Sequence, residues 1–350
     1  MSADPAGSGR ARRAAWWIAQ WQQPGPAQAV LLPLSWLFAG LSAARRQLYR
    51  WGVLRSHAVP RPVIVVGNLI AGGAGKTPVV IALVQLLRQM GHVPGVISRG
   101  HGGRHTDGAR LVTHSSDPAE VGDEPLLIHL RTGAPVAVAR QRVLAAQALC
   151  QAHPAVTVLV ADDGLQHLAL ARDLDVLVFD DRGIGNGRLL PAGPLRQHLP
   201  AALPPRTLVI YGAGQPSTPL PGFIGWRRLG TIFTLQDWWV TDAVTSRVVR
   251  LRDRPLLAAA GLARPEAFFT MLEAQGLKIT RLPLPDHFDY ATLPWPPDTP
   301  DVIVTEKDAV KLRPDRVGRT QVWVATLDFA LPADFQAALQ RLLPPAAPTR

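Results

Sequence analysis

Short apolar segments alternate with helical patterns through the first half of the chain. The segments have strand length and are rich in β-branched residues, and they cover residues 63–67, 93–98, 135–139, 157–161 and 175–179. Between them, the spacing of apolar positions predicts helices over 78–90 and 141–152. Strands of this kind, separated by helices, are typical of a parallel sheet covered on both faces. We therefore expect an α/β fold whose ligands gather at the carboxyl ends of the strands.

The pattern changes after about residue 199, where prolines become frequent. Residues 200–221 hold six of them, which favours a domain boundary in this region. Beyond it the pattern predicts a second, smaller α/β unit, with strands over 255–260, 302–305 and 321–326, helices over 265–275 and 335–343, and a hairpin from 229–240 and 247–251. The expected organisation is an N-terminal segment (1–56), a core domain (57–205) and a smaller C-terminal α/β domain (206–345).

The N-terminal segment combines apolar and basic residues. Residues 27–44 are predominantly apolar, but Pro33 and Gly40 interrupt a run that is short for a membrane span, which takes about 20 strongly apolar residues. The first 61 residues hold eight arginines against one aspartate, and five of the ten tryptophans. This combination favours a helix lying in a membrane interface, with a true span or a buried helix as alternatives. The positive charge would also suit nucleic acid, but no nucleic-acid motif is present, so we expect no such partner.

Length and cysteine content narrow the class of protein. With 350 residues, the chain is long enough for two domains with a sizeable core. Its single cysteine, Cys150, excludes an internal disulfide and gives no indication of a cysteine-based metal site. We therefore expect a cytosolic location for the folded domains.

A glycine-rich turn follows the first predicted strand and leads directly into a helix. In this context Gly75-Lys76-Thr77 indicates a phosphate-binding loop and an NTPase-like fold. Backbone N–H groups and the helix N-terminus would hold phosphate oxygens, Lys76 would reach the β- and γ-phosphates, and Thr77 would hold Mg²⁺. The first glycine position of the general pattern is here Ile70. We expect ATP and Mg²⁺ as cofactors, with the nucleotide on Ile70, Ala71, Gly72, Gly73, Ala74, Gly75, Lys76 and Thr77.

Two carboxylates follow the predicted strand over 157–161. Asp162 and Asp163 match the second carboxylate element of a phosphate-loop fold. One would hold Mg²⁺, directly or through water, and the other would support it. A pair of solvated turn aspartates is the alternative.

The remaining candidates are polar residues near predicted strand ends. Asp123, expected on a loop, is a candidate base for an acceptor hydroxyl, although acidic loop residues beside proline are common. His287 becomes relevant only if the two domains bring it near Asp123. Lys307 could face an anionic substrate, but its surroundings equally suit a helix N-cap. The Gly- and Pro-rich loop 185–196 carries Arg188 and Arg196, which suit phosphate recognition or a solvated connector.

Taken in order, these motifs resemble the tetraacyldisaccharide 4'-kinase family, the lipid A 4'-kinases. The resemblance spans nearly the whole chain, over Leu31–Trp36, Val66–Asn68, Gly72–Pro78, Ser98–Gly100, Gly122–Pro125, Asp162–Gln166, Leu189–Arg196, Ala260–Ala263, Phe268–Phe269, Asp286–His287 and Thr305–Asp308. The chain departs from the family pattern at His101, where tyrosine is frequent, and at Phe288, where a second histidine is frequent.

The resemblance implies a kinase on the cytoplasmic face of the inner membrane of a Gram-negative-type cell, held there through its N-terminal segment. Such an enzyme transfers the γ-phosphate of ATP to the 4'-hydroxyl of an acylated disaccharide 1-phosphate, and no obligate protein partner is inferred. By the family pattern Asp123 is the base and His287 assists it, while Lys76, Thr77, Asp162 and Asp163 serve the phosphates and Mg²⁺. The substrate contacts would come from Arg99, Asn186, Arg188, Arg196 and Lys307.

Two other functions fit parts of the sequence. A membrane-associated phosphate-loop ATPase switch would use water as its only acceptor. A basic nucleic-acid-binding ATPase is the weaker alternative, since it leaves the apolar N-terminal run unexplained.

Overall fold

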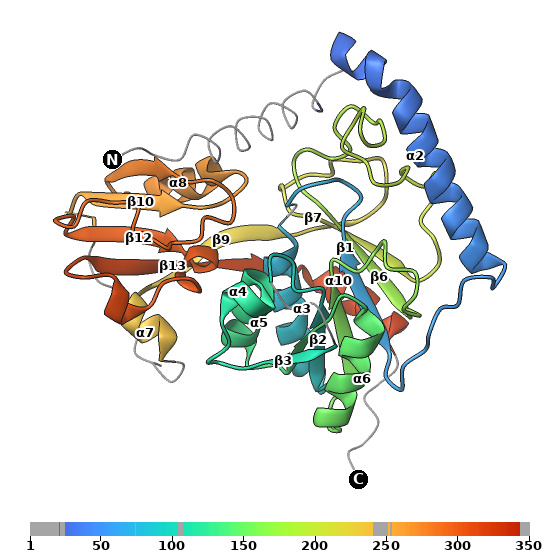
Figure 1. Cartoon of the computed structure of the whole chain (residues 1–350), viewed down its shortest axis with the longest axis horizontal. Helices are drawn as coiled ribbons and strands as arrows, with labels where there is room; N and C mark the ends of the chain where they lie inside the picture. Colours follow the sequence, from blue (N-terminus) through green and yellow to red (C-terminus); the bar gives the residue numbers. More distant parts are fainter. Residues whose placement is uncertain are drawn as a thin grey trace.

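The computed structural model describes residues 21, 25–73, 75–103, 108–240, 251–252 and 254–343. Over these residues the chain forms two sheets with helices packed around them, and a long N-terminal helix lies along the outer side of the larger unit (Figure 1). The predicted α/β fold with a mostly parallel sheet is confirmed.

The larger sheet has, in the described part of the chain, eight strands in the order β3-β4-β2-β5-β1-β6-β7-β8. Neighbouring strands are parallel throughout, except that β3 runs antiparallel to β4. Every residue of β1, β2, β4, β5 and β7 is buried, as expected for strands covered on both faces. The strands are β1 (Val63–Gly67), β2 (Pro94–Ser98), β3 (Arg110–Val112), β4 (Val136–Val138), β5 (Val158–Asp162), β6 (Leu174–Phe179), β7 (Thr207–Tyr211) and β8 (Phe223–Ile224).

Helix α3 (Lys76–Gln89) is the central helix of this unit. It follows the strand in the middle of the sheet, and eight of its fourteen residues are buried. Helix α5 (Asp123–Thr132) packs beside α3, and α6 (Arg142–Ala152) packs on β2 and β4. The last helix, α10 (Ala333–Leu342), returns from the smaller unit to contact β7. The short helix α4 (Pro118–Val121) precedes α5 directly.

The smaller sheet has five strands, among the residues described, in the order β11-β10-β12-β13-β9. It is parallel except for the pair of β13 with β9. Its strands are β9 (Trp226–Thr234), β10 (Leu256–Ala260), β11 (Ile279–Pro283), β12 (Asp301–Thr305) and β13 (Gln321–Ala330). Helices α7 (Leu235–Trp239), α8 (Pro265–Ala274) and α9 (Glu306–Ala309) and the 3-10 turn η1 (Pro314–Arg316) accompany them. The long strands β9 and β13 run toward the larger unit, where β13 contacts α3 (Figure 1).

The structure differs from the sequence expectations in three places. Strands β7 and β8 lie beyond the expected boundary at 205/206 but belong to the larger sheet, because the proline-rich residues between them are connections within that sheet. Of the stretch 229–240, expected as one arm of a hairpin, residues up to 234 belong to β9, which pairs with β13, and 235–239 form a helix; the other arm, 247–251, lies outside the described residues except for its last residue. Asp123 is not on a loop but is the first residue of α5.

Helix α2 (Pro26–Arg50) exposes apolar side chains on one face. Val30, Leu34, Leu37 and Leu41 are 54–79 % exposed and follow each other at helical spacing. The opposite face holds the buried Ser35, whose hydroxyl donates to the Leu189 carbonyl (2.7 Å). The helix thus packs on the protein through Ser35 and the partly buried Phe38 and Ala39, and leaves Val30, Leu34, Leu37 and Leu41 exposed. Among the residues that the structure describes, no helix is both long enough and apolar enough to cross a bilayer.

Candidate active site

The phosphate loop occupies the turn between β1 and α3. Gly75 caps α3 with a left-handed backbone (φ +70°), and Gly72 also has positive φ (+89°), so both positions favour glycine. Lys76, at the start of α3, lies back across the loop, with Nζ 3.4 Å from Asn68 Oδ1 and 3.4 Å from Asp163 Oδ1. Its side chain is 10 % exposed. The lysine ammonium and the N-terminus of α3 therefore face the same turn, as an anion site requires.

Ile70 and Ala71, the first two residues predicted to bind the nucleotide, contact another loop of the protein. Ile70 is buried and forms a bridge with Leu195, and the Ala71 N–H donates to the Pro194 carbonyl (2.7 Å). Their backbone groups are therefore engaged with residues 185–196 in this structure. Ala74 lies outside the described residues. Among the described residues of the predicted nucleotide loop, Gly72, Gly73, Gly75, Lys76 and Thr77 remain candidates for contact with a phosphate.

Asp162 and Asp163 have opposite electrostatic surroundings. Asp162 ends β5, is 1 % exposed, and its Oδ1 is buried with no hydrogen-bond partner among the described residues. Burial, followed by the charges of Glu124 and Asp163, raises the pKa of Asp162 to about 7. Burial also raises the pKa of Asp163, but Lys76 and then Arg196 outweigh it, and the net pKa is lowered.

A cation fits this arrangement at Asp162. A buried carboxylate oxygen without a partner is costly in the protein alone, and a divalent cation would satisfy it and favour the charged form. Magnesium in phosphate sites usually takes one or two carboxylates and completes its shell with phosphates and water. The described ranges contain no cluster of three or more His, Cys, Asp or Glu side chains that could hold a metal ion. Thr77 lies in the first turn of α3, next to Lys76.

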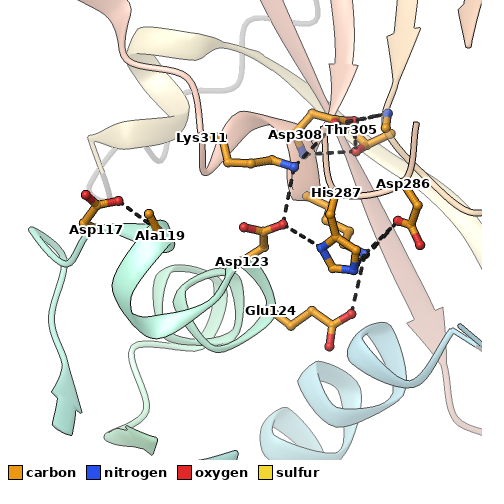
Figure 2. A network of polar contacts seen from close by, with 11 residues as sticks. Asp117, Ala119, Asp123, Glu124, Asp286, His287, Thr305, Asp308 and Lys311 are labelled. Atoms are coloured by element: carbon orange, nitrogen blue, oxygen red, sulfur yellow. Dashed lines mark hydrogen bonds and ion pairs between the residues drawn. The ribbon is translucent and has the colours of Figure 1, made fainter. Parts of the chain in front are cut away.

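The second group of polar residues lies where α5 meets the smaller unit. His287 Nδ1 is 3.1 Å from Asp123 Oδ2, and Lys311 Nζ is 3.3 Å from the same oxygen (Figure 2). Lys307 Nζ lies 3.3 Å from His287 Nε2, 3.3 Å from Asp286 Oδ1 and 3.7 Å from Glu124 Oε1. The structure thus brings Asp123 and His287 together across 164 positions of sequence.

Local backbone geometry fixes both members of this pair. Gly122 has φ +91°, and a Cβ there would lie 2.8 Å from the His101 carbonyl oxygen, so the start of α5 needs glycine to approach the loop after β2. His287 has φ +60°, a left-handed conformation that is uncommon for a residue with a side chain. Its ring lies 5.9 Å from that of His101, one of the two positions where the chain departs from the family pattern. Strained residues of this kind concentrate at functional sites.

Asp123 carries a negative charge in this environment. Burial raises its pKa, but the hydrogen bond from His287 and the charge of Lys311 outweigh that effect, and the pKa lies below its ordinary value. Both contacts reach Oδ2. Over the described residues, Oδ1 has no hydrogen bond or ion pair, which leaves one carboxylate oxygen for an acceptor hydroxyl.

The expected substrate residues differ in what they contact. Arg196 pairs with Asp163 (3.3 Å) and Gln166 (3.3 Å), and Arg99 is exposed at the end of β2. Asn186 folds its own loop, since Nδ2 donates to the Ala192 carbonyl (2.9 Å) and Oδ1 accepts from the Arg188 N–H (3.1 Å). A structural role therefore accounts for Asn186 in this structure, whereas Lys307 belongs to the Asp123–His287 group.

Sequence reasoning missed three further polar residues of the site. Arg182 donates to the Gly73 carbonyl and pairs with Asp180, and Arg227 of β9 lies so close to Gly75 that a Cβ there would be 2.0 Å from its Nη2. Lys311 reaches Asp123. None of the three forms part of a local motif, and the contacts that bring them to the site, with Gly73, Gly75 and Asp123, each span more than a hundred residues. Only the folded topology could have assigned them to the site.

The two groups together define a class of protein. A phosphate loop, a carboxylate on the neighbouring strand and an aspartate–histidine pair held across two units fit a nucleotide-dependent phosphotransferase with an alcohol acceptor.

Comparisons with known proteins give the family. The model of the tetraacyldisaccharide-1-P 4'-kinase family matches residues 27–344, and the chain belongs to this family. The chain is 52 % identical to the tetraacyldisaccharide 4'-kinase of Methylibium petroleiphilum, over 100 % of this chain and 99 % of that one. It is 51 % identical to that of Leptothrix cholodnii, over 94 % and 95 %. The protein is accordingly a kinase.

A solved structure has the same fold. The "apo" form of LpxK from Aquifex aeolicus, in complex with ATP, superposes with a TM-score of 0.74 at 26 % identity, covering 90 % of this chain and 99 % of that one. The similarity in three dimensions therefore extends over both sheets.

Proposed function

We propose that this kinase transfers the γ-phosphate of ATP to the 4'-hydroxyl of tetraacyldisaccharide 1-phosphate, giving the bis-phosphorylated lipid A precursor. The observation that carries the proposal is the pair of Asp123 and His287 beside the phosphate loop. Helix α5, which begins at Asp123, packs beside α3, which begins at Lys76, and this packing supports one site that includes the base and the loop. A nucleotide switch with water as acceptor has no need of a base built for an alcohol.

Each residue has a defined role in the transfer. Asp123 Oδ1 orients the acceptor hydroxyl and takes its proton as the new bond forms between the 4'-oxygen and the γ-phosphorus. The bond from that phosphorus to the β,γ-bridging oxygen breaks, and Lys76 and the N-terminus of α3 stabilise the charge on the departing diphosphate. His287 holds Asp123 Oδ2 in place. Because the transition state is loose, positioning and charge neutralisation matter more than a strong base.

Asp162 and Thr77 would hold Mg²⁺, with Asp163 supporting the site through Lys76 and Arg196. The ion would neutralise phosphate charge when bound. Arg99, Arg188 and Arg196 would face the phosphate or sugar of the acceptor.

Helix α2 would bring the enzyme to its substrate at the inner-membrane surface, on the cytoplasmic face. Its exposed apolar face suits shallow insertion, and Arg45, Arg46 and Arg50 near its C-terminus suit anionic lipid headgroups. Ser35 contacts Leu189 of the loop 185–196, which in turn contacts Ala71 of the phosphate loop through Pro194. A lipid held at α2 would therefore lie on the side of the molecule where this loop meets the nucleotide site.

Mass spectrometry of the lipid product tests the function. We expect purified protein with Mg-ATP and the disaccharide monophosphate in detergent to give a product heavier by one phosphate, and none without ATP. Hydrolysis of ATP with no phosphorylated lipid would overturn the proposal and favour the ATPase switch.

The membrane role predicts the effect of charge on α2. The triple variant Leu34→Glu/Leu37→Glu/Leu41→Glu should lower the fraction of protein that sediments with anionic vesicles by about tenfold, because it places three charges on the apolar face. The matched control, Val93→Glu/Leu144→Glu, changes two exposed apolar residues elsewhere and should bind like wild type. Equal binding of the triple variant and wild type would refute docking through α2.

A further inference from the structure

Lys311 has an ammonium group that the phosphate loop and the Asp123–His287 pair do not explain. It follows α9 in the smaller unit, and its side chain is 7 % exposed. Its Nζ is buried and makes no hydrogen bond of good geometry among the described residues. A buried ammonium is costly unless nearby charge compensates it, so its position needs a reason.

Among the groups around the Lys311 ammonium, one carboxylate oxygen lies closer than the others. Asp308, the nearest other carboxylate, lies 3.9 Å away, but the Thr305 hydroxyl and the Gly261 N–H already donate to it. The ring of Tyr290 lies 5.6 Å from Nζ on another side. The closest anionic oxygen is Asp123 Oδ2, at 3.3 Å, on the other unit of the molecule (Figure 2).

Lys307 does not duplicate this contact. Its Nζ lies near His287 Nε2, Asp286 and Glu124, and no contact with a carboxylate oxygen of Asp123 is found in the described part of the chain. Lys307 therefore acts on the histidine side of the pair, whereas Lys311 acts on the aspartate itself.

We propose that Lys311 is a positioning residue for phosphoryl transfer, whose buried ammonium keeps Oδ2 of Asp123 turned toward the smaller unit and leaves Oδ1 facing the acceptor hydroxyl. The inference rests on the proposed function, because it takes Asp123 as the base. His287 and Lys311 approach Oδ2 from different segments of the smaller unit, and together they fix the rotation of the carboxylate. A hydroxyl oriented by a fixed Oδ1 meets the phosphorus along one line, and this alignment carries much of the rate.

A double-variant cycle tests the proposal. Lys311→Met keeps the length of the side chain and removes the charge; we expect kcat to fall by about 10- to 100-fold, with the dissociation constant of Mg-ATP within about twofold of wild type. If Lys311 acts through Asp123, the double variant Lys311→Met/Asp123→Asn should have a kcat within about twofold of that of the Asp123→Asn single variant. Lys278→Met, which removes an exposed lysine of the smaller unit, is the matched control and should match wild type.

The outcomes separate the inference from the function it rests on. Losses that multiply in the double variant, or a Lys311→Met enzyme with wild-type kcat, would overturn the role of Lys311 while leaving the kinase intact. An Asp123→Asn enzyme with wild-type kcat would instead refute the base. Should Lys311→Met not fold, Lys311→Arg decides: it keeps the charge, and we expect at least a tenth of wild-type kcat with unchanged Mg-ATP binding. Loss of Mg-ATP binding in that variant would place Lys311 at the nucleotide and overturn the inference.

Discussion

Lys76→Ala should lower kcat by at least about 1,000-fold, because the ammonium expected to neutralise the transferred and departing phosphates is lost. The fold should survive. Asp163, which Lys76 contacts, keeps its ion pair with Arg196 (3.3 Å). Transfer of labelled phosphate from ATP to the disaccharide lipid, measured in single-turnover and steady-state assays, checks the rate, and thermal unfolding without nucleotide checks the fold.

Two control variants make this result specific. Lys76→Arg keeps the charge but replaces a compact ammonium with a larger, planar guanidinium group, and we expect most of the activity to be lost as well. Lys278→Ala removes an exposed lysine far along the chain and should leave kcat unchanged. A Lys76→Ala enzyme that transfers phosphate at a rate within tenfold of wild type, with the same melting temperature, would contradict the assignment of the phosphate loop.

The fold was predictable where local pattern and burial agree. The strand Val63–Gly67 is buried on both faces, and the turn between it and Lys76 has positive φ at Gly72 and Gly75, which favours glycine. Sequence alone therefore predicts the strand, the loop and the helix that follows. Asp162 was found in the same way, because it ends a fully apolar strand next to that loop in the sheet.

The rest depends on contacts between distant segments. The proline-rich stretch after residue 199 suggests a linker, yet β7 within it pairs with β6 and is buried along its whole length. Asp123 was expected on a loop because it stands between predicted sheet elements and beside Pro125, and acidic residues next to proline are common in loops. Arg227 and Lys311 carry no local signal: each lies in the smaller unit and reaches the larger one only because the two sheets pack together. Tertiary contacts of this kind leave no trace in hydrophobic periodicity.

Asp123→Asn should lower kcat by about 100- to 10,000-fold with little change in the dissociation constant of Mg-ATP. The amide keeps the shape of the side chain, so His287 and Lys311 retain a neighbour, but it cannot take the proton of the acceptor hydroxyl. Transfer to the lipid, measured beside equilibrium binding of Mg-ATP, separates the two effects.

A neighbouring aspartate provides the comparison that decides the role. Asp117 caps α4, and its Oδ1 accepts from the Ala119 N–H (2.8 Å). Because asparagine caps a helix about as well as aspartate, Asp117→Asn should have the kcat and the stability of wild type. If Asp123→Asn weakens Mg-ATP binding as much as it lowers kcat, Asp123 serves the nucleotide and not the acceptor. If only kcat falls, the carboxylate acts where the hydroxyl meets the phosphorus. The contacts at Oδ2 then have a mechanistic reason, because they fix the orientation of the carboxylate on which the transfer depends.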